Sequence, residues 1–223
     1  MNSSSDTQNQ TLTKGLTFIA VGLWAAVALS AADAGFFQAQ PDQLPLNFIY
    51  ASVTPVAAFL GLYAVSKAFR KMVLGWDIKL LTAIQAWRVI GWAMLVLLAF
   101  GILPGFFAWP AGLGDIAIGL AAPYYAIRLA NRPETASHRG FILWNWLGIL
   151  DFVVALGTGI MASGAIPAIT GSGATTAAMG VLPMAMLPGF FVPLFFMAHL
   201  AVLLQVRRLR ATAPGHNPNP VTA

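Results

Sequence analysis

The stretch LLTAIQAWRVIGWAMLVLLAFGIL, residues 80–103, decides the class of fold. It is long enough to cross a bilayer as an α-helix, which takes about 20 predominantly apolar residues. It contains one charged residue, Arg88, and a charge that faces lipid inside a membrane is costly. The stretch therefore predicts a transmembrane helix that turns Arg88 toward protein or water.

Five further stretches of the same kind lie along the chain, at about residues 15–32, 46–66, 109–130, 141–161 and 184–206. The 223 residues are 58% hydrophobic and 9% charged, with a mean hydropathy of +0.76. A soluble domain has about 25% charged residues, and a transmembrane strand would alternate in polarity, which these stretches do not. We predict an all-α polytopic transmembrane bundle of six spans over residues 15–206. A disordered polar leader, residues 1–14, and a basic and then disordered tail, residues 207–223, flank it.

Clusters of basic residues fall on alternate connections between these stretches, and this sets the predicted orientation. They are Lys67, Arg70, Lys71 and Lys79, then Arg128, Arg132 and Arg139, then Arg207, Arg208 and Arg210. The positive-inside rule places these connections and both termini in the cytoplasm, as expected for a multi-pass protein of the cell inner membrane. An alternative stays open, because Lys14, the first apolar run and Ala32-Asp33-Ala34 also resemble a cleavable signal peptide. Cleavage would leave five spans.

A few ionisable residues lie inside the predicted spans and are the candidate functional residues. Arg88 lies about 13 Å and Asp151 about 16 Å from the cytoplasmic edge, on helices that run in the same direction. We therefore predict an ion pair between them, since pairing lowers the cost of burying both charges. The whole candidate intramembrane polar cluster is Arg88, Asp151, Asp115, His199, Gln85 and Asn145.

Helical spacing places several of these residues on stripes that favour burial. The stripes are Trp144, Gly148, Asp151, Ala155 and Thr158; Gly112, Asp115, Gly119 and Ala122; and Thr82, Gln85, Arg88 and Trp92. Small residues let helices approach closely in lipid, so we expect both aspartates at helix contacts. We also expect Trp87 and Trp92 to pack inside the bundle. Asn145 and Gln205 lie near cytoplasmic helix ends, where water can reach them.

Motifs for enzymatic chemistry are missing from the sequence. There is no Cys, and no HExxH, GxSxG or phosphate-binding loop. A buried b-type haem generally takes two axial ligands, and His199 is the single His within a span. The net charge of +5 comes from residues at span ends, which favours anionic lipid rather than nucleic acid as the partner. We predict no catalytic residue, no metal site and no cofactor.

Three segments carry a resemblance to a known group of proteins. They are Gln85-Ala-Trp-Arg88 through Gly101-Ile-Leu-Pro104, Trp109-Pro-Ala-Gly-Leu-Gly-Asp115, and Trp144-Asn-Trp-Leu-Gly-Ile-Leu-Asp151. They resemble an uncharacterised family of small bacterial multipass inner-membrane proteins, over spans three to five. The resemblance implies a bacterial inner membrane and supplies no activity and no catalytic residue.

Three classes of function remain open from the sequence. The first is a helical bundle, locked by intramembrane polar contacts, with a structural or partner-binding role. The second is a small permease or channel-like protein that moves a small solute or protons past Arg88, Asp151, Asp115 and His199. The third is a membrane-embedded enzyme or cofactor protein. The expected partner is the lipid bilayer; the sequence leaves open a homo-oligomer, a membrane partner and the identity of any small-molecule ligand.

Overall fold

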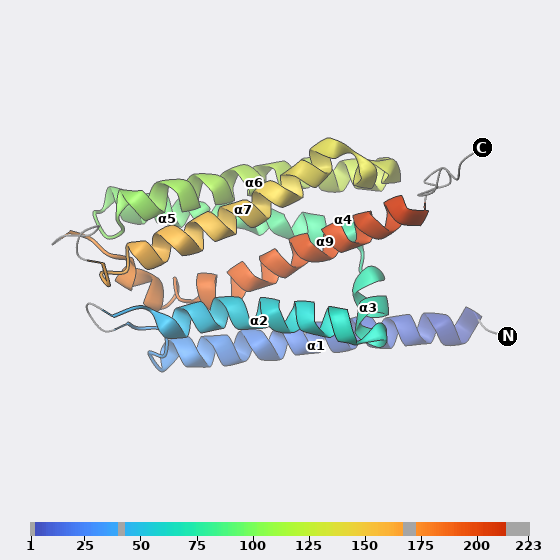
Figure 1. Cartoon of the computed structure of the whole chain (residues 1–223), viewed down its shortest axis with the longest axis horizontal. Coiled ribbons are helices and arrows are strands. Elements are labelled where there is room, and N and C mark those ends of the chain that lie inside the picture. The colour runs from blue at the N-terminus through green and yellow to red at the C-terminus, as the bar shows by residue number, and fades with distance from the viewer. Residues whose placement is uncertain (1–2, 40–42, 167–172, 213–223) are drawn as a thin grey trace, which may run out of the picture. The chain divides into compact units, whose positions relative to one another are not determined.

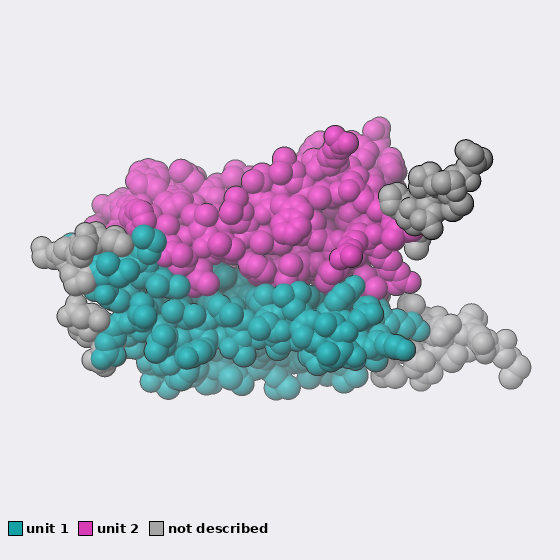
Figure 2. All heavy atoms as spheres, viewed as in Figure 1, with its two compact units in different colours: residues 1–72, 160–194 teal, residues 73–159, 195–223 magenta. Residues whose placement is uncertain are grey.

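The structure, a computed structural model, describes residues 3–39, 43–166 and 173–212. The chain divides into two compact units, residues 1–72 with 160–194 (unit 1) and residues 73–159 with 195–223 (unit 2), coloured separately in Figure 2. Every regular element in the described ranges is helical, and six stretches are long and apolar enough to cross a membrane. The predicted all-α class and the number of candidate spans are confirmed. The predicted disorder of the tail concerns mostly residues 213–223, which lie outside the described ranges.

Unit 1 contains two long helices, α1 (Ser3–Asp33) and α2 (Leu46–Val65), with the short helix α3 (Lys67–Leu74) following α2. The backbone of α1 includes residues 3–14, for which the sequence predicts a disordered leader. In Figure 1, α3 turns sharply away from the axis of α2. Arg70 of α3 donates hydrogen bonds to the carbonyl oxygens of Tyr63, at 3.1 Å, and Ala64, at 2.7 Å. These bonds satisfy carbonyls that the end of α2 leaves without helical partners.

The remainder of unit 1 packs against the turn that follows α1. The turn contains Gly35, whose φ of +75° favours glycine, and Phe37, two residues later, is buried. The 3₁₀ helix η3 (Thr176–Gly180) and the π-helical segment η4 (Leu187–Phe191) meet Phe37 through Gly180 and Gly189. A Cβ on Gly180 would lie 2.6 Å from the Phe37 carbonyl oxygen. Part of the connection between spans five and six is therefore folded.

Unit 2 begins with α4 (Ile78–Ala83), the 3₁₀ helix η1 (Ile84–Gly91) and α5 (Trp92–Ala99), which together form one span. A tight turn at Gly101, with φ of +69°, leads into α6 (Gly105–Asn131). The amides of Gly101 and Ile102 donate to the carbonyls of Leu98 and Leu97, which is the hydrogen-bond pattern of a glycine-capped helix end. α5 and α6 consequently run antiparallel (Figure 1). The short 3₁₀ helix η2 (Pro133–Ser137), α7 (Arg139–Met161) and most of α9 (Val192–Thr212) complete the unit.

The 3₁₀ winding in the middle of the third span differs from the predicted regular helix. With three residues per turn, side chains three apart lie on one edge. Thr82, Gln85, Arg88 and Gly91 share that edge and are all buried. The predicted fourth member, Trp92, is 59% exposed, and Trp87 is 67% exposed. The prediction that these two tryptophans pack inside was wrong. For Trp92 the reason is the 3₁₀ winding, which puts Gly91 on the buried edge in its place.

Glycines bring η1 into backbone contact with α6. A Cβ on Gly91 would lie 2.8 Å from the carbonyl oxygen of Gly112, and a Cβ on Gly119 would lie 2.7 Å from the amide nitrogen of Val89. The predicted stripe Gly112, Asp115, Gly119 and Ala122 is buried along its whole length. Because the two backbones lie this close together, a side chain of η1 can contact a side chain of α6.

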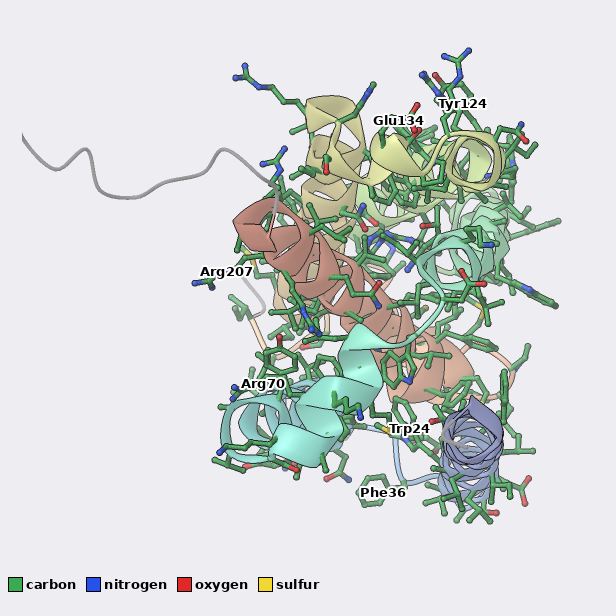
Figure 3. The ribbon with its side chains drawn as sticks, turned by 90° about the vertical axis from the view of Figure 1, so that its right-hand side faces the viewer. Trp24, Phe36, Arg70, Tyr124, Glu134 and Arg207 are labelled. Carbon is green, nitrogen blue, oxygen red and sulfur yellow. The ribbon has the colours of Figure 1, made fainter. Side chains whose placement is uncertain are left out.

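The basic residues of unit 2 gather where α6 and α9 end and α7 begins. Arg210 donates to the carbonyl oxygen of Ser137 at 2.7 Å, which joins the end of α9 to η2. Gln205 donates to the carbonyl of Val73 at 3.0 Å and is 8% exposed, so the expectation that water reaches Gln205 was wrong. Figure 3 looks onto this end of the unit, where Tyr124, Glu134 and Arg207 are labelled.

Candidate functional site

Arg88 is the centre of a buried polar cluster in unit 2. Its Nε donates to Asp115 Oδ1 of α6 at 2.7 Å, and its Nη2 donates to Asp151 Oδ2 of α7. The Arg88 side chain is 1% exposed, whereas those of Asp115 and Asp151 are 11% and 10% exposed. One guanidinium thus joins three elements through two carboxylates, and we call Arg88, Asp115 and Asp151 the ion triad.

The remaining nitrogen of Arg88, Nη1, points to α7 and α9. It lies 3.1 Å from His199 Nε2 and 3.4 Å from the carbonyl oxygen of Gly148. An arginine in a protein stays protonated and can only donate. His199 Nε2 must therefore accept, so the imidazole is neutral and carries its proton on Nδ1. The Phe152 ring, with its centroid 3.8 Å from the guanidinium carbon, covers one face of Arg88.

A chain of hydrogen bonds continues from His199. With its proton on Nδ1, His199 donates to Asn145 Oδ1 at 2.9 Å, and Asn145 Nδ2 donates to the carbonyl of Phe141 at 2.9 Å. Asn145 is 1% exposed, so the expectation that water reaches it was wrong. Its side chain is turned into the helix contact, where it holds His199 in one tautomer.

Gln85 belongs to the same buried edge of η1 but bonds elsewhere. Its Nε2 donates to the carbonyl oxygen of Phe195 at 3.1 Å, and its Oε1 has no hydrogen-bond partner among the described residues. Trp144, also on the predicted stripe of α7, lies edge-on to His199 with ring centroids 5.3 Å apart. Its Nε1 is likewise buried without a partner in the described part of the chain.

Each polar side chain around Arg88 rests against a glycine of a neighbouring element. A Cβ on Gly91 would lie 2.6 Å from Asp115 Cβ, and one on Gly114 would overlap the Asp151 carboxylate. A Cβ on Gly148 would overlap the His199 ring. The cluster is therefore tightly enclosed, and the glycines make room for it.

The sequence predicted part of this arrangement. The Arg88–Asp151 ion pair is confirmed, and His199 and Asn145 join it by hydrogen bonds. The pairing of Arg88 with Asp115 was not predicted. A signal for it was present, because Arg88 lies eleven residues before the end of α5 at Ala99 and Asp115 lies ten residues after the start of α6 at Gly105. Positions at nearly equal distances from a tight antiparallel turn lie at similar heights.

The described residues contain no group of three or more His, Cys, Asp or Glu side chains that could hold a metal ion. The chemistry of the cluster is that of charge and hydrogen bonding: two carboxylates, one guanidinium and one neutral imidazole. Such a set can lock helices together, and it can bind or release a proton.

Comparison with known proteins places the chain in a family. Neither the curated proteins nor the solved structures contain a match to it. A family model described as a domain of unknown function, DUF8737, matches residues 45–207, which include every member of the polar cluster. Because this match covers well over half of the 223 residues, the chain belongs to the DUF8737 family of unknown function.

Proposed function

We propose that the chain is a multi-pass integral membrane protein with a structural or partner-binding role, in which the ion triad locks unit 2. The observation that carries this proposal is the reversed distribution of polarity. Large apolar side chains are exposed along the helices, whereas Arg88 and His199 are buried; the exposed ones include Leu16, Phe18, Leu23, Trp87, Trp92 and Leu120. This is the arrangement that a hydrocarbon solvent requires.

The basic residues support an orientation with both termini in the cytoplasm. In unit 2, the arginines of the ends of α6 and α9 and of the start of α7 gather at one end of the helices, together with Lys79 near the start of α4. The opposite turn, residues 100–104, contains no charged residue. Anionic lipid and the positive-inside rule favour the basic end on the cytoplasmic side of an inner membrane.

Fractionation and topology reporters test this proposal. We expect the full chain to stay in the membrane pellet after alkaline washing, and a reporter fused after Val206 to be active in the cytoplasm. A second reporter inserted in the turn at residues 100–104 serves as the matched periplasmic control. A periplasmic signal after Val206, or a chain that remains monodisperse without detergent, would overturn the proposal.

An N-terminal tag distinguishes a mature protein with six spans from one with five. If the first apolar stretch is retained as a span, a tag placed before Lys14 remains on the mature protein. Loss of the tag from membrane-bound chain would instead identify residues 15–34 as a cleaved signal peptide. The six-span proposal would then be wrong, although the membrane location would stand.

The lock itself is supported by how closely the triad is enclosed. Phe152 covers the guanidinium, and Gly91, Gly114 and Gly148 leave no room for a Cβ beside the polar groups. The triad joins η1, α6 and α7, and His199 adds α9. A contact that involves four elements at one point is well suited to hold a helix bundle in a single arrangement.

A second candidate is a small permease or channel-like protein for protons or a small solute. Two observations favour it: the third span is wound as a 3₁₀ helix where it carries Arg88, and the sixth begins with the π-helical segment η4. Irregular winding inside helices is often found at functional hinges, and transporters bind substrates at interrupted helices. Vesicles containing the protein and a pH-sensitive dye test for proton flux. Flux abolished by Arg88→Met, with protein of equal yield, would favour the permease over the lock.

A further inference from the structure

The charges of the ion triad do not balance. Arg88 supplies one positive charge, and Asp115 and Asp151 supply two negative charges when both are ionised. A net charge inside a poorly polar environment is expensive, and the usual response of a buried group is to bind or release a proton. The triad therefore requires one more positive charge for neutrality.

Among the residues that the structure describes, no neighbouring group supplies that charge. The titratable or charged side chains that face the triad are Arg88 from η1, Asp115 from α6, Asp151 from α7 and His199 from α9. His199 accepts a hydrogen bond from Arg88 and is therefore neutral. Within the described residues, neither carboxylate forms an ion pair with any cation other than Arg88.

Each carboxylate has one oxygen that is available to a proton. Arg88 binds Asp115 through Oδ1 and Asp151 through Oδ2, and no described residue donates a hydrogen bond to the other two oxygens. Gly114 backs the Asp151 carboxylate and offers only its backbone there. The side chains of Asp115 and Asp151 are 11% and 10% exposed, and Arg88 stays protonated, so the carboxylates are the members of the triad that can exchange a proton.

We propose that the ion triad is a proton-binding site that holds one exchangeable proton on either Asp115 or Asp151 at neutral pH. The proton comes from water, and its binding forms a single O–H bond and converts one carboxylate to a carboxylic acid. The other carboxylate stays ionised and paired with Arg88. This inference rests on the proposed membrane location, which surrounds the triad with hydrocarbon and protein and makes a net charge there costly.

Infrared spectroscopy of the full chain, purified and reconstituted in lipid vesicles, tests the proposal. We expect the carbonyl-stretch band of a protonated carboxylic acid at neutral pH, with the small shift that exchange into heavy water produces. Asp115→Asn and Asp151→Asn should each abolish the band, because the single carboxylate that remains is then neutralised by Arg88. Glu134→Gln, which removes an exposed carboxylate of η2, is the matched control and should leave the band unchanged.

Two results would overturn the proton site. The first is a band that is absent in wild-type protein at neutral pH, or that survives in both aspartate variants. The second is a band that appears only when sodium is replaced by a bulky organic cation, which would make the missing charge a sodium ion. If the membrane location is right, the protein is found in the vesicle pellet whether or not the band is seen. Failure of the proton site can therefore be distinguished from failure of the proposed function.

Discussion

Unit 1 and unit 2 are both built from apolar helices but bury different kinds of core. Unit 2 is organised around a charged side chain whose donors are met by Asp115, Asp151 and His199. Unit 1 is organised around Phe37, which contacts Phe48 edge-on and fits against Gly180 and Gly189. Ion pairs and hydrogen bonds depend on direction as well as distance, whereas aromatic packing depends mainly on shape.

This difference has a consequence for how each unit should respond to change. A core that depends on paired charges fails when one partner is removed, because the other is left buried and unpaired. A core that depends on packing loses stability in proportion to the contacts or hydrogen bonds removed. Substitutions in the two units therefore test whether only unit 2 depends on paired charges for its stability.

The largest effect is expected from Arg88→Met. It leaves the ionised carboxylate of the triad buried without its cation, and removing one partner of a buried ion pair costs about 3–5 kcal/mol. We expect little monodisperse protein in size-exclusion chromatography and a strongly lowered thermal transition in detergent.

Two matched variants sharpen that experiment. Arg128→Met removes an arginine that bonds the exposed hydroxyl of Tyr124, and it should change stability little. Arg88→Met combined with Asp115→Asn and Asp151→Asn removes every charge of the triad and should recover part of the lost stability. A triple variant no better than Arg88→Met would contradict the view that unpaired charge causes the loss.

A smaller effect is expected from Gly148→Ala in α7. The added methyl group would overlap the His199 ring, and overpacking of this kind costs about 1–3 kcal/mol. Gly157 lies in the same helix, and a Cβ added there would have no atom within 4 Å. Gly157→Ala should therefore raise the free energy of unfolding by about 0.5–1 kcal/mol through helix propensity. Thermal unfolding of the two variants in one detergent measures the contrast, and equal effects would argue against close packing on His199.

Gly35→Ala and Gly101→Ala compare the two units at an equivalent feature. Both glycines have positive φ, +75° and +69°, and end helices with the same hydrogen-bond pattern. An L-residue in this conformation costs about 1–2 kcal/mol, so the two variants should lose similar stability. Gly61→Ala, with open space around it in α2, is the control. A clear difference between the two variants would show that the caps are not equivalent.

The smallest effect is expected from Ser52→Ala in unit 1. Its buried hydroxyl donates to the carbonyl oxygen of Pro188 at 3.0 Å, and a single neutral hydrogen bond contributes about 0.5–1.5 kcal/mol. Thr158→Val, which removes a hydroxyl bonded within α7, serves as the comparison in unit 2. If Ser52→Ala were as damaging as Arg88→Met, the distinction between the two cores would fail.

Much of the architecture could be predicted from the sequence. The predicted spans and the apolar helical stretches of the structure differ by five residues or fewer at every end. The glycine and aspartate stripe of α6 is buried, as predicted. Of the predicted stripe of α7, Trp144 and Gly148 are buried, whereas Asp151, Ala155 and Thr158 are half-buried. Such features follow from the free energy of moving single residues between water and lipid. That free energy depends on residue type, which the sequence gives directly.

Other features depended on contacts that the sequence does not display. The segment Leu-Pro-Gly-Phe-Phe occurs twice, at residues 103–107 and 187–191. The first copy starts α6 from an extended Pro104, whereas the second is π-helical, with the Pro188 carbonyl bound by Ser52 and Phe190 packed on Trp24. Identical local sequence thus adopts two conformations, because different neighbours satisfy its backbone and cover its rings.

The sequence by itself determined that the chain is helical, where its apolar stretches lie and that its few internal charges are buried. These outcomes come from solvation, which acts on each residue separately. Only the tertiary structure decided that Arg88 serves two carboxylates, that Gly91 rather than Trp92 faces α6, and that His199 is neutral. Those outcomes depend on the winding of η1 and on distances between side chains far apart along the chain, where a shift of one position on a helix changes the partner.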